Sequence, residues 1–353
     1  MKFLKPIGGE QWFDVNIFNN SLNNFSDDRC TFTSGGQSSI NFIIGQLRMK
    51  DDEFMLLPAY LCPTIVWNLQ RNKVNFDFYR INRDLSIDIP DLEKKLLEKK
   101  VRAVFFINYF GFYHDRSTLD YLRSLKGKGI ALVEDAVQML WFSKQEFTGD
   151  YVFNSYRKFL PADGSLVLSK AKGDFEACRD EYYEYQNTAR LKLTAFVKYG
   201  LGSMEEFVAL FAKAEEAYGR DTLIKGMSDI SRHLLNKVDG EHIGNIRRSN
   251  YSYLWDKLAD SSEIRPLLGK EFLGKNIPIG FPVLIKNRDR VKKELRGRSI
   301  YCPAHWPILG EEWAQGFGDS IYLAERILTL PIDQRYEKED LDRLVQELRS
   351  LCK

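Results

Sequence analysis

The fold of this chain is decided by the segment Val152-Phe153-Asn154-Ser155-Tyr156-Arg157-Lys158-Phe159-Leu160-Pro161-Ala162-Asp163-Gly164-Ser165. It is interpreted together with the upstream segment Leu132-Val133-Glu134-Asp135-Ala136-Val137-Gln138. The upstream segment is typical of a buried strand that carries an acidic pair at its carboxyl end. The downstream segment places Lys158 between a hydroxyl residue and a Pro/Gly turn. Together the two segments predict a carboxylate and a lysine that serve one site.

A carboxylate and a lysine of this kind suit the ring of pyridoxal phosphate (PLP). Lys158 would form a Schiff base with the aldehyde, and Asp135 would keep the pyridine nitrogen protonated, so that the ring accepts the electrons of a substrate carbanion. Each residue also has a simpler interpretation, because Asp135 could cap the following helix and Lys158 could be a surface lysine. The presence of Gln138 and the apolar flanks of Lys158 favour the cofactor interpretation, since burial would lower the pKa of the lysine.

The composition is that of a globular protein. The chain has 353 residues, of which 44% are hydrophobic, enough for a sizeable core and more than one packing unit. Basic and acidic residues nearly cancel, at 51 and 49, so no strong field favours nucleic acid or a membrane. Five cysteines without a CxxC pair and four histidines without ligand spacing predict reduced thiols and no metal site. The early break in the first apolar run and the lack of any long apolar stretch predict a cytoplasmic chain.

Short apolar runs alternate with helical patterns in the first half of the chain. Strands are predicted at 54–57, 74–79, 101–108 and 130–133, and helices at 63–71, 91–100 and 117–125. This alternation predicts a largely parallel sheet covered on both faces, with ligands at the carboxyl ends of the strands. Helical stretches follow at 174–220 and 227–258, then β-like pieces at 278–285 and 298–303 and helices near 287–296 and 337–351. We therefore expect an N-terminal arm (1–29), a large domain (30–240) and a small α+β domain (241–353).

Several motifs follow one another in the order of a known family. Glu134 to Gln138 resembles the family's E-D-A-A-Q, and Ser155 to Gly164 resembles its S-x-R-K-x-L-P-x-x-D-G-G. Pro58 to Cys62 resembles its P-A-Y-T-C, and Asn108 to Gly111 resembles its H-Y-F-G. Tyr301 to Pro307 and Leu328 to Pro331 resemble its small domain. Over residues 30 to 345 the chain thus resembles the DegT-type sugar aminotransferases. These are fold type I PLP enzymes, built like aspartate aminotransferase, with a large domain and a small α+β domain.

The resemblance implies roles for individual residues. Asp135 pairs with the pyridine nitrogen, Ala136 packs against the ring, Gln138 helps to hold the cofactor, and Lys158 forms the Schiff base. Further implied residues are Gly36, Gln37, Ser38 and Ser155 at the phosphate, Tyr60 as the nearest stacking ring, and His305, Tyr301 and Asn108 at the substrate.

The chain departs from the family at several of these positions. The family's S-G-T-A-A-L becomes Ser34 to Ile40, a stretch that a plain N-capped helix also explains. Ser155 and Lys158 are only three residues apart, Cys62 falls at the usual aromatic position, and Ser165 replaces the second glycine. Asn245 and Asn250 are the candidates for an asparagine that reaches the phosphate across subunits in many relatives.

The implied activity is the transfer of an amino group from an amino acid, with glutamate the expected donor, to a keto group of a nucleotide-linked sugar. A homodimer with shared active sites is also implied. Two alternatives stay open. One is a sugar dehydratase of the same fold, but such relatives carry histidine in place of the lysine. The other is a non-catalytic binding or regulatory relative, which the altered phosphate motif keeps open.

Overall fold

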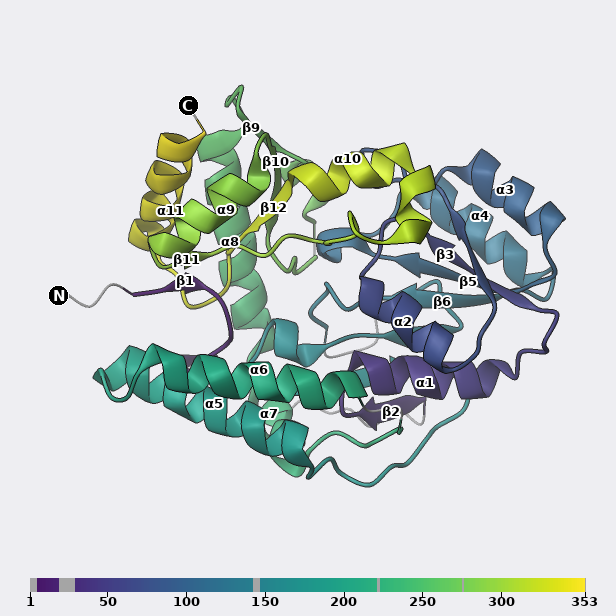
Figure 1. Cartoon of the computed structure of the whole chain (residues 1–353), viewed down its shortest axis with the longest axis horizontal. Helices are drawn as coiled ribbons and strands as arrows, with labels where there is room; N and C mark the ends of the chain where they lie inside the picture. Colours follow the sequence, from purple (N-terminus) through teal and green to yellow (C-terminus); the bar gives the residue numbers. More distant parts are fainter. Residues whose placement is uncertain (1–4, 19–28, 142–146, 221–222, 275, 353) are drawn as a thin grey trace.

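The computed structural model describes residues 5–18, 29–141, 147–220, 223–274 and 276–352. Figure 1 shows a large sheet with its helices on one side of the molecule and a smaller group of helices and strands, coloured green to yellow, on the other. Among the helices described, none is both long and apolar enough to cross a membrane.

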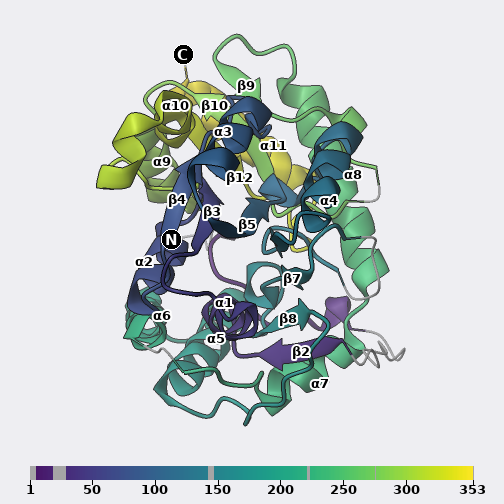
Figure 2. The same ribbon diagram turned by 90° about the vertical axis from the view of Figure 1, so that its right-hand side faces the viewer.

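The large sheet has seven strands and is mostly parallel. Its order is β2 (Cys30–Thr33), β8 (Ser165–Leu168), β7 (Tyr151–Phe153), β6 (Ala131–Asp135), β5 (Val101–Ile107), β3 (Phe54–Pro58) and β4 (Phe76–Tyr79). Only β8 runs antiparallel to its neighbours (Figure 2). The middle of β5, from Val104 to Ile107, is continuously apolar and buried, as expected for a strand covered on both faces. The predicted parallel α/β fold is therefore confirmed.

Among the described residues up to Arg220, six helices belong to the large part, and three of them begin at an aspartate that caps the first turn. The six helices are α1 (Gly36–Leu47), α2 (Pro63–Arg71), α3 (Ile89–Glu98), α4 (Arg116–Lys126), α5 (Glu181–Tyr199) and α6 (Met204–Arg220). Asp88, Asp115 and Asp180 cap α3, α4 and α5, each by accepting a hydrogen bond from a backbone N–H of the first turn. Helices α5 and α6 form a hairpin, and in Figure 1 α6 lies end to end with α1.

The smaller part packs helices on a three-stranded antiparallel sheet in the order β12-β10-β9. Its elements are α8 (Gly240–Leu258), β9 (Ile264–Pro266), β10 (Phe281–Ile285), α9 (Arg288–Gly297), β11 (Ile300–Tyr301), α10 (Gly318–Arg326), β12 (Ile327–Leu330) and α11 (Lys338–Leu351). The preceding helix, α7 (Asp229–Lys237), lies under the large part, where Ser231 contacts Asp163 (Figure 1). Tyr251 of α8 packs both on Phe112 of the large part and on Phe281 of the small sheet. The domain boundary at residue 240 therefore stays a prediction.

The N-terminal segment is packed rather than extended freely. Residues Ile7–Gly8 form β1, which pairs in parallel with β11, and both Ile7 and Trp12 are buried. The expected loose arm is therefore wrong for these residues, because a two-residue strand leaves no periodicity in the sequence. The predicted arm also includes residues 1–4 and 19–28, which lie outside the described residues.

Candidate active site

The carboxyl ends of the central strands place the acidic pair. In the sheet register, Asp135 lies opposite Ile107 of β5 and Phe153 of β7. Because successive side chains alternate between the two faces of a strand, Glu134 points away from Asp135. The Glu134 carboxylate accepts hydrogen bonds of 2.7 Å from Asn108 Nδ2 and from a backbone N–H of the loop before β7. Glu134 therefore holds the strand ends together, and Asp135 is left for the site.

Asp135 is buried, and no cation of the described residues is in direct contact with it. Its Oδ1 accepts a hydrogen bond of 2.8 Å from the N–H of Val137. Burial raises the pKa of this carboxyl to about 7, against the smaller lowering by that N–H and by the charge of Lys158. A positively charged group placed next to Asp135 would make it fully ionised.

The loop that carries Lys158 is fixed by tight contacts. Lys158 ends a short 3-10 helix, Tyr156–Lys158, and the N–H of Tyr156 donates to Gly164 O at 3.0 Å. Gly164 has a φ of +98°, and a Cβ there would lie 2.4 Å from the Met227 side chain, so only glycine fits. Asp163 accepts a hydrogen bond of 2.5 Å from Ser231 Oγ. These contacts explain why the loop after Lys158 needs aspartate and glycine at the end of its Pro-Ala-Asp-Gly turn.

The amine of Lys158 has no hydrogen-bond or ion-pair partner among the described residues. The positive charge of Arg157 lowers the pKa of Lys158, and burial adds to this effect. The side chain is nevertheless exposed, because it borders two cavities. This arrangement favours a neutral, nucleophilic amine.

The first cavity, which we call the inner cavity, has a volume of about 290 Å³. It brings together most of the residues predicted to serve the cofactor, namely Gly36, Gln37, Asp135, Gln138, Ser155 and Lys158. Gln138 Oε1 accepts a hydrogen bond of 2.6 Å from the N–H of Phe110, whereas the buried Nε2 has no partner among the described residues. The inner cavity therefore presents an amide donor, a carboxylate and a free amine.

Four predicted residues do not line either cavity. Ser38 Oγ bonds to Ser34 Oγ at 2.8 Å, and Ala136 is buried in the core while Val137 faces the inner cavity. Ala136 and Val137 both lie beyond the end of β6, and Val137 is in the turn that follows the strand. The other two are Tyr60 and Asn108.

Tyr60 and Asn108 are held in other contacts. The hydroxyl of Tyr60 donates to the carbonyl of His305, and its ring packs against Trp306 at 5.4 Å between centroids. The Asn108 amide holds Glu134 on the opposite side of the strand end. Tyr60 and Asn108 thus support the site without facing it, and Trp306 lines the inner cavity instead.

The second cavity, the outer cavity, has a volume of about 380 Å³ and shares Arg157, Lys158, Ile279 and His305 with the inner cavity. Tyr301 and His305 line it, as the substrate prediction requires. His305 Nδ1 lies 2.8 Å from Thr329 Oγ1, and burial, helped by the charges of Lys158 and Lys292, lowers the pKa of the ring to about 3. His305 is therefore a neutral group at the junction of the two cavities.

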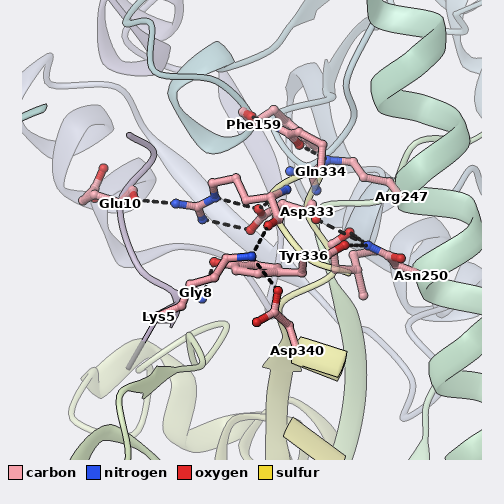
Figure 3. Close-up of polar contacts among 12 residues, drawn as sticks. Lys5, Gly8, Glu10, Phe159, Arg247, Asn250, Asp333, Gln334, Tyr336 and Asp340 are labelled. Atoms are coloured by element: carbon pink, nitrogen blue, oxygen red, sulfur yellow. Dashed lines mark hydrogen bonds and ion pairs between the residues drawn. The ribbon is translucent and has the colours of Figure 1, made fainter. Parts of the chain in front are cut away.

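One wall of the outer cavity is a polar network that joins distant parts of the chain (Figure 3). Arg335 donates to both carboxylate oxygens of Asp333, at 2.6 and 2.9 Å, and to the backbone carbonyl of Glu10 at 2.8 Å. Gln334 donates to the carbonyl of Phe159, next to Lys158, at 2.9 Å. The network thus fixes the N-terminal segment, the Lys158 loop and the small part relative to one another.

Asn250 belongs to the same network. Its amide donates to the carbonyls of Ile332, Asp333 and Tyr336, whereas Asn245 accepts from Arg248. Both asparagines therefore have contacts within their own chain.

Sequence reasoning missed four residues that line the inner cavity, Arg157, Glu215, Tyr218 and Trp306. The sequence could have indicated Arg157, because this residue directly precedes Lys158. Glu215 and Tyr218 come from α6, whose charged pattern is that of any solvated helix. Among the described residues, no group of histidine, cysteine and carboxylate side chains could hold a metal ion.

Comparison with known proteins supports this architecture. No protein-family model matches the chain, and no curated protein matches it by sequence. Spr1654 of Streptococcus pneumoniae, described as a sugar aminotransferase and solved in a PLP form, has a TM-score of 0.68 at 13% identity, over 98% of each chain. DesV of S. venezuelae, solved with a ketimine intermediate, gives 0.62 at 17% identity, over 92% of this chain and 85% of its own.

A DegT DnrJ EryC1 StrS aminotransferase from Brucella abortus gives a TM-score of 0.63 at 14% identity, over 92% of this chain and 86% of its own. These similarities extend through the large sheet, the Lys158 loop and the small part, because they cover nearly the whole chain. The chain therefore has the fold type I architecture of the PLP-dependent sugar aminotransferases.

Proposed function

We propose that this chain is a PLP-dependent aminotransferase that moves an amino group from an amino-acid donor, glutamate first, to a keto group of a sugar. The observation that carries the proposal is the pair formed by Lys158 and Asp135. Both face the inner cavity, and neither has an ion-pair partner among the described residues. A structural role would leave such a pair bonded to each other or to neighbours.

The residues of the inner cavity fit PLP. Asp135 can pair with the pyridine nitrogen, and the unpartnered Nε2 of Gln138 is a donor for an oxygen of the cofactor. Val137 and Trp306 offer apolar surface for the ring. When bound, PLP supplies an electron sink for the bonds at the donor's α carbon.

The chain's own residues then have distinct tasks. The lowered pKa of Lys158 favours the neutral amine that attacks the aldehyde, and once released this amine can carry a proton between the α carbon and the C4′ carbon of the cofactor. Asp135 holds a proton on the pyridine nitrogen through a charge-assisted hydrogen bond. The Tyr60 and Glu134 contacts keep the cavity wall and the strand ends in place.

The finer part of the proposal is a nucleotide-linked acceptor. Lys292 and Arg296 lie one turn apart on α9 and border the outer cavity, beside Lys158. Both are exposed, and among the described residues neither has an ion pair. A diphosphate would supply the missing anions.

We also propose a homodimer with shared active sites and a cytoplasmic location. Exposed apolar side chains on the α5–α6 hairpin, among them Leu191, Tyr199 and Leu201, support a further subunit contact. The five cysteines are all free thiols, as in proteins of a reducing compartment.

The proposal is tested by an absorbance titration of the purified protein with PLP, followed by glutamate. We expect a visible band that glutamate removes, and neither effect in Lys158→Ala. Lys292→Ala is the matched control, because it removes another cavity lysine. A protein that PLP leaves colourless would contradict the proposal and favour a binding or regulatory role.

A further inference from the structure

The inner cavity must neutralise a phosphate if it is to hold PLP, because a buried phosphate without a cation is strongly unfavourable. Three of its lining residues can carry positive charge, Arg157, Lys158 and His305. The pKa of Lys158 is lowered by Arg157 and by burial, and the pKa of His305 is lowered to about 3. A guanidinium keeps its charge throughout the physiological pH range, so Arg157 is the permanent cation among these three residues.

Arg157 is held at the end of the cavity where α1 begins. Its guanidinium lies over the ring of Tyr218, 5.4 Å from the centroid. Tyr218 Oη accepts a hydrogen bond of 3.0 Å from the N–H of Gln37, in the first turn of α1. A Cβ at Gly35 would lie 2.5 Å from Tyr218 Oη, so glycine is required for this approach. Tyr218 thus places Arg157 beside the helix start.

The inner cavity also contains an unused hydroxyl donor. Ser155 is 5% exposed and lines the inner cavity, and no hydrogen bond of its Oγ is found among the described residues. The guanidinium, this hydroxyl and the N-terminal dipole of α1 are the groups that proteins use to bind phosphate.

Glu215 of α6 currently satisfies Arg157. The two side chains form an ion pair, with 18% of the Arg157 side chain exposed and 52% of the Glu215 side chain. Because the Glu215 side chain is half exposed, its carboxylate can turn toward solvent when another anion reaches Arg157. Arg157 is enclosed by the cavity and Tyr218, so it is the fixed member of the pair.

We propose that Arg157 binds the phosphate of PLP and that Glu215 occupies Arg157 until the phosphate displaces it. The inference rests on the proposed function, since it takes PLP as the cofactor. A guanidinium can donate two parallel hydrogen bonds to phosphate oxygens, which a lysine cannot do. Arg157 thereby compensates for the altered Ser34 to Ile40 stretch.

The experiment compares PLP with pyridoxal, which has the same ring and aldehyde but no phosphate. Dissociation constants of both are measured by visible absorbance for the wild-type protein, Arg157→Gln and Arg157→Lys. Arg179→Gln, an exposed arginine paired with Asp229, is the matched control. We expect Arg157→Gln to weaken PLP binding about ten- to a hundredfold and pyridoxal binding less than about twofold, with Arg157→Lys in between.

Two further measurements support the assignment. Inorganic phosphate should compete with PLP in the wild-type protein and not in Arg157→Gln. Glu215→Gln should bind PLP more tightly than the wild-type protein, because the competing carboxylate is gone. Circular dichroism shows whether each variant is folded, and if Arg157→Gln does not fold, the PLP-to-pyridoxal ratio of Arg157→Lys decides.

The result that would overturn the inference is an unchanged PLP-to-pyridoxal ratio in the folded variants. Weaker glutamate binding with that ratio unchanged would assign Arg157 to the donor carboxylate and also overturn it. A wild-type protein that binds neither PLP nor pyridoxal would refute the proposed cofactor and this inference together, so the two failures are distinguishable.

Discussion

Asp135 should destabilise the cofactor-free protein, and its replacement by asparagine tests this directly. Asparagine has nearly the same shape, and its oxygen can still accept the hydrogen bond from Val137 N–H. The pKa of Asp135 is raised from 3.8 in an exposed carboxyl to about 7 by burial. Since one pKa unit corresponds to about 1.4 kcal/mol, the buried carboxylate costs the fold ~4 kcal/mol when it is ionised.

The sign follows from proton binding. The folded state binds the proton more tightly than the unfolded chain, so the destabilisation is absent below about pH 4, grows as the pH rises and is complete above about pH 7. Asp135→Asn should therefore raise the free energy of unfolding by up to ~4 kcal/mol at pH 8 but only ~1.5 kcal/mol at pH 5.

The assay is urea denaturation of the cofactor-free wild-type protein and Asp135→Asn at both pH values. Saturating PLP should reduce this gain by ~1.5–3 kcal/mol, because the variant loses a charge-assisted hydrogen bond to the pyridine nitrogen. The reasoning is refuted if Asp135→Asn is less stable than the wild type at pH 8 without PLP, or if its effect is the same at both pH values.

Other predictions concern the supports of the site. Gly164→Ala should lower the free energy of unfolding by ~2–3 kcal/mol in urea denaturation, because its φ is +98° and Met227 blocks the Cβ; Gly297→Ala, with open space, should change it by less than ~1 kcal/mol. Tyr60→Phe should cost about 1 kcal/mol of stability and leave PLP affinity within twofold, since the ring faces no cavity; a large affinity loss would restore Tyr60 as a stacking ring. The double variant Lys292→Gln/Arg296→Gln should raise the KM for a nucleotide-linked acceptor about tenfold or more at low salt and leave the half-reaction with glutamate unchanged; an equal effect on both would contradict an acceptor site there.

The sheet could be predicted from the sequence because its strands are buried on both faces. Runs such as 103–107 are continuously apolar, and helices with one polar face separate them, so the type and order of the elements are encoded locally. The acidic pair at the end of β6 and the lysine before Pro161 could be predicted as well, because each belongs to a short local sequence motif. Two strands of the Lys158 region, β7 and β8, are only three and four residues long and gave no separate signal.

The rest of the site depends on contacts between segments far apart in the sequence. Tyr218 reaches Gln37 across 181 residues, and Arg335 reaches Glu10 across 325. Val137 and not Ala136 lines the inner cavity, and both follow the end of β6 in a turn whose geometry no sequence pattern encodes. Resemblance supplied Tyr60 and Asn108, whose partners in this chain are His305 and Glu134.

The central claim is that Lys158 is the residue that carries PLP. Borohydride reduction of the protein mixed with PLP, followed by peptide mass spectrometry, tests it most directly, because it locates the cofactor on one side chain. We expect a single modified peptide that contains Lys158, and we expect this modification to disappear when glutamate is added before the borohydride. Modification of Lys292 or of scattered surface lysines, with Lys158 unmodified, would contradict it.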